Sequence, residues 1–144
     1  MTEKVMPVPE GYHSVTPYLV VKDAGALMDF LERAFGAVEI HRTSGPDGSI
    51  RHAEARIGDS MIMMGQARDS STPRPAMLYL YLPDVDAAYA KAVGAGGKSI
   101  QEPTTHFYGD RSGAVEDSQG NQWWIATHVE DVSPEEIERR ARAQ

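Results

Sequence analysis

Apolar residues recur along the chain with two different periods. In residues 77–82 every second residue is a leucine, the period of a strand, so the leucines share one face and Met77, Tyr79 and Tyr81 share the other. Because both faces are largely apolar, this strand is expected to be covered on both sides. Between residues 24 and 35 the apolar residues instead recur every three or four positions, which predicts a helix that buries one side.

The two halves of the chain repeat this order of elements. Residues 16–36 align with residues 77–97 at an offset of 61. Asp23 then coincides with Asp84, each at the typical N-cap position of a predicted helix, and a glycine ends each aligned segment. Each half therefore begins with a strand followed by a helix.

Later in each half, a glycine-led pair predicts a hairpin turn before a last strand: Gly58-Asp59 before residues 61–64, and Gly120-Asn121 before residues 123–126. Each half is thus predicted to be a βαβββ module, and the fold class to be α+β, with curved mixed sheets around a pocket. The expected parts of one domain, residues 1–144, are a first module at 12–66, a second module at 76–130 and a short C-terminal helix at 133–144.

The same alternation assigns faces to the other strands. Tyr18 and Trp124 are predicted to join Tyr79 and Tyr81 on the face turned away from the helices, where they would line a largely apolar pocket. An alternative is that these aromatic rings fill an ordinary core. We favour the pocket because the tyrosine hydroxyls need partners or water.

One middle strand carries polar residues on a single face. His52, Glu54 and Arg56 alternate with alanines. If they point into the pocket, Glu54 would orient His52 as a general base while Arg56 holds an anionic group. The alternative is a solvated, hydrogen-bonded edge.

A long polar loop is predicted at residues 103–113. It contains His106, Phe107 and Tyr108 before a glycine, a composition that suits a lid over a pocket. The alternative is a surface loop held by a pair between Asp110 and Arg111.

Composition then narrows the function. The 144 residues are 41% hydrophobic and 24% charged, as in an ordinary globular domain, and no apolar run is long enough to span a membrane. No export signal is visible, so we expect a cytoplasmic protein. A net charge of -7 argues against nucleic acid as a partner, and the absence of cysteine excludes thiol chemistry and disulfides.

Four segments of the chain, spanning about residues 12–130, resemble the glyoxalase/bleomycin-resistance/dioxygenase superfamily, also called the vicinal oxygen chelate fold. They are TPYLVVKD, FLERAFGA, YLPDVDAAYAKAVGAGG and YGDRSGAVEDSQGNQWWIATH. The last segment is similar to a PhnB-like branch of small bacterial homologues. The resemblance implies paired βαβββ modules, a ligand pocket and a homodimer.

Metal-using members of that superfamily place their ligands at positions that correspond here to Thr16, Met77 and Trp124. None of these side chains is an ordinary metal ligand. We therefore expect no metal cofactor. A divalent metal bound elsewhere remains the alternative, because His and Glu side chains are available outside these positions.

Two classes of function follow. The first is a metal-free protein that binds or sequesters a metabolite or natural product. The second is an enzyme of the same superfamily, either a metal-dependent lyase, isomerase or dioxygenase, or a metal-free acid–base catalyst that uses His52 and Glu54. The expected ligand-binding residues are Tyr18, Arg56, Met77, Tyr79, Tyr81, Tyr108 and Trp124.

Overall fold

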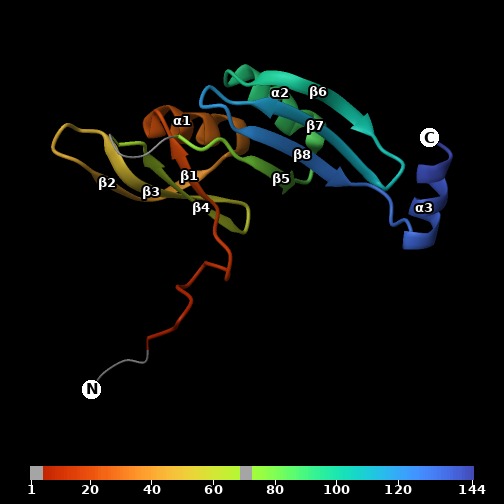
Figure 1. The fold of residues 1–144 in the computed structure, drawn as a ribbon, viewed down its shortest axis with the longest axis horizontal. Helices are drawn as coiled ribbons and strands as arrows, with labels where there is room; N and C mark the ends of the chain where they lie inside the picture. Colours follow the sequence, from red (N-terminus) through yellow and green to blue (C-terminus); the bar gives the residue numbers. More distant parts are fainter. Residues whose placement is uncertain (1–4, 69–72) are drawn as a thin grey trace.

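The computed structural model describes residues 5–68 and 73–144, and within them the chain forms two four-stranded mixed sheets and three helices (Figure 1). The first sheet has the strand order β1-β4-β3-β2 and the second the order β5-β8-β7-β6. In each sheet the first pair is parallel and the other two pairs are antiparallel. The predicted α+β fold class with two βαβββ modules is confirmed.

The elements lie in chain order with the following bounds. The first module contains β1 (Tyr18–Val21), α1 (Ala24–Phe35), β2 (Val38–Ser44), β3 (Ile50–Ile57) and β4 (Ser60–Gln66). The second contains β5 (Met77–Tyr81), α2 (Val85–Gly94), β6 (Lys98–Thr105), β7 (Asp110–Glu116) and β8 (Gln122–His128), and α3 (Pro134–Arg142) follows it.

The helices begin at the predicted caps. The Asp23 carboxylate accepts a hydrogen bond from the backbone N–H of Ala26, and Asp84 does the same for Ala87. Ser133 caps α3 in the same way. Each cap satisfies one of the amide groups that the first helical turn leaves without a partner.

One core joins the two modules. Helices α1 and α2 pack against each other, and each covers one face of its own sheet. Phe35 of α1 reaches Trp123 of β8, with ring centroids 5.4 Å apart. The predicted facing of the strands is confirmed, because Trp123 and Ile125 are fully buried while Trp124 points the other way. In α2, Val85 and Ala92 are buried in the core, whereas Val93 is exposed.

The prediction of a long loop at residues 103–113 is wrong. Strand β6 continues to Thr105 and β7 starts at Asp110, so only a four-residue turn separates them. The turn closes through a bond from the His106 N–H to the Asp110 carbonyl. Cross-strand pairing supplies partners for the backbone groups, and this outweighs the polar composition that suggested a loop.

Candidate functional site

Each sheet has a second face, opposite the helices, which we call the open face. Tyr18 lies on the first open face and is 48% exposed, while Tyr79 and Tyr81 lie on the second and are 43% and 63% exposed. The expected aromatic face is therefore present in each module. Within one chain the two faces belong to separate sheets and do not enclose these rings, because the modules join through their helices.

A buried carboxylate organises the second open face. Asp110, at the start of β7, is only 5% exposed. Its Oδ2 accepts hydrogen bonds of 2.9 Å from the hydroxyls of both Tyr79 and Tyr81, and its Oδ1 lies 2.9 Å from His128 Nδ1. The other ring nitrogen of His128 lies 2.7 Å from Asp131. The two tyrosines are thereby fixed at one carboxylate, with their ring centroids 5.3 Å apart.

These contacts set the protonation states of the cluster. Burial opposes ionisation of Asp110, but hydrogen bonds from His128, Tyr81 and Tyr79 outweigh it and hold the pKa of Asp110 below its usual value. Burial and the bond to Asp110 raise the pKa of Tyr79, and the same bond raises the pKa of Tyr81. Asp110 and then Asp131 raise the pKa of His128. At neutral pH Asp110 is ionised and both phenols keep their protons.

The first open face carries a shorter chain of hydrogen bonds. The Tyr18 hydroxyl lies 3.2 Å from His52 Nδ1, and His52 Nε2 lies 2.8 Å from a carboxylate oxygen of Glu54. These residues come from β1 and β3, on either side of β4, and share a face because their backbone positions have the same parity. Sequence reasoning paired His52 with Glu54, and the structure brings Tyr18 to them.

Three other predicted site residues do not contact these clusters through polar bonds. Arg56 is exposed on β3, and its guanidinium has no carboxylate partner among residues 5–68 and 73–144. Met77 is exposed at the start of β5. Trp124 is half-buried beside Tyr79 in the sheet register, and its indole N–H donates to the Gln122 side chain at 3.2 Å.

Tyr108, the remaining predicted residue, lies in the turn between β6 and β7. Its ring stacks on His106 with centroids 5.1 Å apart and planes 5° from parallel. It is close enough to contribute, by charge repulsion, to the raised pKa of Tyr79 and Tyr81. The turn thus brings a third phenol near Tyr79 and Tyr81.

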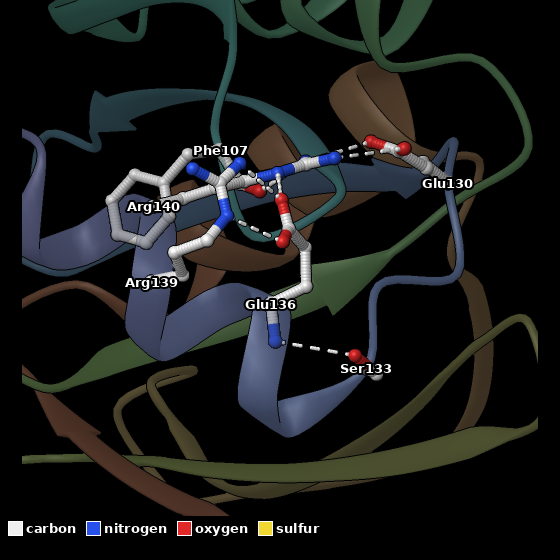
Figure 2. A network of polar contacts seen from close by, with 6 residues as sticks. All are labelled: Phe107, Glu130, Ser133, Glu136, Arg139 and Arg140. Carbon is white, nitrogen blue, oxygen red and sulfur yellow. Dashed lines mark hydrogen bonds and ion pairs between the residues drawn. The ribbon is translucent and has the colours of Figure 1, made fainter.

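Helix α3 holds this turn in place (Figure 2). Arg140 donates to the Phe107 carbonyl at 2.8 Å and also pairs with Glu130 and Glu136. No α3 residue is fully buried, so the helix is attached mainly through these charges. Bonds from Arg139 and Arg140 lower the pKa of Glu136 to about 2, so that carboxylate is ionised at any ordinary pH.

Two hollows adjoin the tyrosines. One of about 550 Å³ lies between the β3–β4 hairpin and β5, and Tyr79 and Tyr81 form part of its wall. Another of about 170 Å³ lies beside Tyr18, next to Gly65. The larger volume is in the range of small-molecule sites.

Comparison with known proteins shows which family has this architecture. Residues 11–125 match the model of the Glyoxalase/Bleomycin resistance protein/Dioxygenase superfamily. The chain belongs to this superfamily. It is 34% identical over 142 residues to an uncharacterized protein of Mycobacterium bovis, an alignment that covers 91% of this chain and 93% of that protein.

Several solved structures share the fold. TioX from Micromonospora sp. ML1 superposes with a TM-score of 0.70 at 23% identity, covering 81% of this chain and 99% of TioX. A glyoxalase/bleomycin resistance protein/dioxygenase family enzyme from Burkholderia phytofirmans PsJN gives a TM-score of 0.65 at 20% identity, covering 79% and 97%. At these identities the likeness concerns the fold alone.

The superfamily's metal chemistry needs converging His or carboxylate donors. At the positions where metal-using members hold them, this chain has Thr16, Met77 and Trp124, which do not fit a divalent cation. Among the described residues, no group of three His, Asp or Glu side chains has a geometry that could hold a metal ion. We therefore derive no chemical step through a metal.

Sequence reasoning missed Asp110 and His128 as partners of the tyrosines. The alternative of a surface loop held by a pair between Asp110 and Arg111 is wrong, because Arg111 binds Asp86 of α2. Residues 110–116, Asp-Arg-Ser-Gly-Ala-Val-Glu, do not alternate between polar and apolar, so the sequence offered no periodic signal for this strand. In the described part of the chain, no helix is long and apolar enough to span a bilayer.

Proposed function

We propose that this superfamily member binds a small organic molecule on its open faces without a metal ion. The single observation that carries the proposal is the fixed, exposed pair Tyr79 and Tyr81 above the buried Asp110 carboxylate. Leaving aromatic rings exposed forgoes the free energy of burying them, and fixing their hydroxyls here requires a buried carboxylate, which also costs free energy. Rigid aromatic rings with a few placed polar groups are the usual lining of a ligand site.

Trp124, Met77 and Tyr108 extend this surface around the two tyrosines. Tyr18 and Arg56 would supply contacts from the first module. The bound molecule, a metabolite or natural product, would stack on the rings, and the protein would act by sequestering or carrying it.

We further propose that a second copy of the chain completes the pocket. Support comes from the two open faces and from the apolar side chains exposed on the edge strands, namely Val38 and Ile40 of β2 and Ile100 of β6. A homodimer that brings the first open face of one copy against the second open face of the other would cover both faces and these side chains. Sedimentation equilibrium at micromolar concentration should give a dimer mass, and a monomer mass would contradict this part.

An enzymatic function is the second candidate, favoured by one observation. Glu54, His52 and Tyr18 form a continuous hydrogen-bonded chain that could move a proton at the Tyr18 hydroxyl. The Burkholderia phytofirmans structure is described as a family enzyme, which keeps this class open for a relative. If any turnover is found, Glu54→Gln should reduce it by at least about tenfold, and unchanged turnover would exclude this role.

The main test is a ligand screen by thermal shift on protein whose metal content has been measured. A ligand that binds only the folded state raises Tm by mass action. We expect hits among planar or aromatic compounds, and the same shifts after treatment with a chelator. Stoichiometric metal with turnover that the chelator abolishes would overturn the metal-free proposal.

The double variant Tyr79→Phe/Tyr81→Phe should reduce the shift, because the rings remain but lose their fixed orientation. Met6→Ala, at an exposed position in the N-terminal segment, is the matched control. We also propose that the protein belongs to the PhnB-like branch of the superfamily. We further propose a cytoplasmic location, which cell fractionation would test.

A further inference from the structure

The direction of the hydrogen bonds on the second open face restricts what a ligand can offer. Tyr79 and Tyr81 both place their hydroxyl protons on Oδ2 of Asp110, each at 2.9 Å. An ionised carboxylate has no proton to give, so the phenols must be the donors. Each phenolic oxygen then has only lone pairs left for a ligand.

The first open face reaches the same polarity by another route. In the tautomer that donates from Nε2 to Glu54 and carries no proton on Nδ1, the Tyr18 hydroxyl donates to Nδ1. With that tautomer Tyr18 also turns its proton away, and its oxygen then offers only lone pairs.

The two carboxylates come from positions that do not correspond. Tyr18 is registered with Met63, and Glu54 lies opposite that same residue. In the second module Tyr79 is registered with Trp124, and the residue opposite Trp124 is Ala114. Asp110 lies four residues earlier on β7. The common outcome is therefore not a simple copy of one repeated motif.

Charges around the second face reinforce this polarity. The His128 ring lies between the carboxylates of Asp110 and Asp131. Even when the ring is protonated, its single positive charge is outnumbered by two negative charges. Arg111 and Arg140 are engaged elsewhere: Arg111 with Asp86, and Arg140 with two glutamates and a backbone carbonyl. The chain as a whole has a net charge of -7.

We propose that the second open face selects an organic cation, a small molecule whose ammonium or guanidinium group lies against the rings and oxygens of Tyr79 and Tyr81. This inference rests on the proposed ligand-binding function and names the class of ligand. The ring faces attract a cation through their quadrupoles, and the hydrogen bonds to Asp110 increase the electron density on both oxygens. At Tyr79 and Tyr81 themselves an anionic group would meet only lone pairs and π faces.

The test compares three compounds of nearly equal size with purified full-length protein by isothermal titration calorimetry at constant ionic strength. They are 2-phenylethylammonium, 2-phenylethanol and phenylacetate. We expect the ammonium to bind about tenfold more tightly than the alcohol, and phenylacetate more weakly than both. If the alcohol or phenylacetate binds as tightly as the ammonium, the cation inference is overturned while the ligand-binding function stands.

Two variants locate the effect. Asp110→Asn removes the charge and frees hydroxyl protons, so the preference for the ammonium over the alcohol should fall to about twofold or less. Asp29→Asn removes one charge from the exposed pair with Arg33 on α1, away from this face, and should leave the preference unchanged. An Asp110→Asn protein that keeps the full preference overturns the inference.

Because Asp110→Asn can also weaken folding, Tyr81→Phe provides a second measurement. It keeps the ring and the carboxylate but removes one acceptor oxygen, and it should lower ammonium affinity more than alcohol affinity. Equal losses for both compounds would overturn the inference. Binding of none of the three by the wild-type protein would also overturn it, whereas the thermal-shift screen decides the wider function separately.

Discussion

The hydroxyl of Tyr79 lies 2.9 Å from the carboxylate of Asp110, and strand β8 runs between the strands that carry them. The bond therefore spans two strand pairings and joins positions 31 residues apart in sequence. It fixes the tyrosine and partly satisfies a carboxylate that is otherwise buried.

Tyr79→Phe should lower the free energy of unfolding by about 1 kcal/mol, because Asp110 loses one of its three donors while the ring stays in place. Urea denaturation measures the change. Tyr108→Phe is the control, since its hydroxyl has no hydrogen bond with another described residue. Equal losses in the two variants would contradict the importance of the bond.

His128 should stabilise the protein more in mild acid than in mild base. Its pKa in the folded protein is raised by Asp110 and Asp131, so its contribution is complete below the unfolded value of about 6.5 and is lost as pH rises through the folded value. His128→Gln should therefore cost more stability at pH 5.5 than at pH 8.5. Denaturation at both pH values tests this.

His13→Gln is the comparison for that experiment, because within residues 5–68 and 73–144 the His13 ring contacts the backbone carbonyl of Asp59 and no carboxylate. Its effect should depend less on pH. A larger cost of His128→Gln at pH 8.5 than at pH 5.5 would show that the sign is wrong.

Gly65 gives Tyr18 the room to reach His52. A Cβ at this position would lie 2.7 Å from the Tyr18 hydroxyl oxygen and 2.8 Å from the Arg51 carbonyl oxygen. Gly65→Ala should therefore displace Tyr18 and cost about 1–3 kcal/mol of stability. Gly94→Ala, where nothing lies within 4 Å of the added Cβ, should be neutral or stabilising. Similar losses in both would contradict the steric argument.

Asp117 is the most heavily bonded carboxylate of the β7–β8 turn. It is buried and accepts from the backbone N–H groups of Gln119 and Asn121, the Asn121 side chain and the Trp123 indole. Asp117→Ala should cost about 3 kcal/mol or more, because several buried donors lose their acceptor. Asp29→Ala, at an exposed pair on α1, should change stability by less than about 1 kcal/mol.

Arg140 should control the attachment of α3 to the second open face. Arg140→Gln removes its ion pairs with Glu130 and Glu136 and weakens the bond to the Phe107 carbonyl, so amides of α3 and of the turn at 106–109 should exchange faster with deuterium. Arg142→Gln loses only a pair with Glu138 within the helix and is the control. Unchanged exchange in Arg140→Gln would contradict the tether.

The candidate site could be predicted only in part. Strand alternation placed Tyr79, Tyr81 and Tyr18 on the faces away from the helices, and it paired His52 with Glu54, because these relations are local in sequence. It could not find Asp110, whose polar neighbours resemble a loop. The partners of Asp110 come from β5 and β8, and their proximity depends on strand order and register.

The sequence by itself determined the two βαβββ modules, the helix caps and the faces of the strands, since periodicity and capping act over a few residues. Only the tertiary structure decided that the two aromatic faces stay on separate sheets in one chain, because packing of α1 against α2 sets the relation of the modules. It also decided that Asp110 accepts the hydroxyl protons of both Tyr79 and Tyr81. That choice depends on side chains brought together from distant strands, and it sets the polarity of the site.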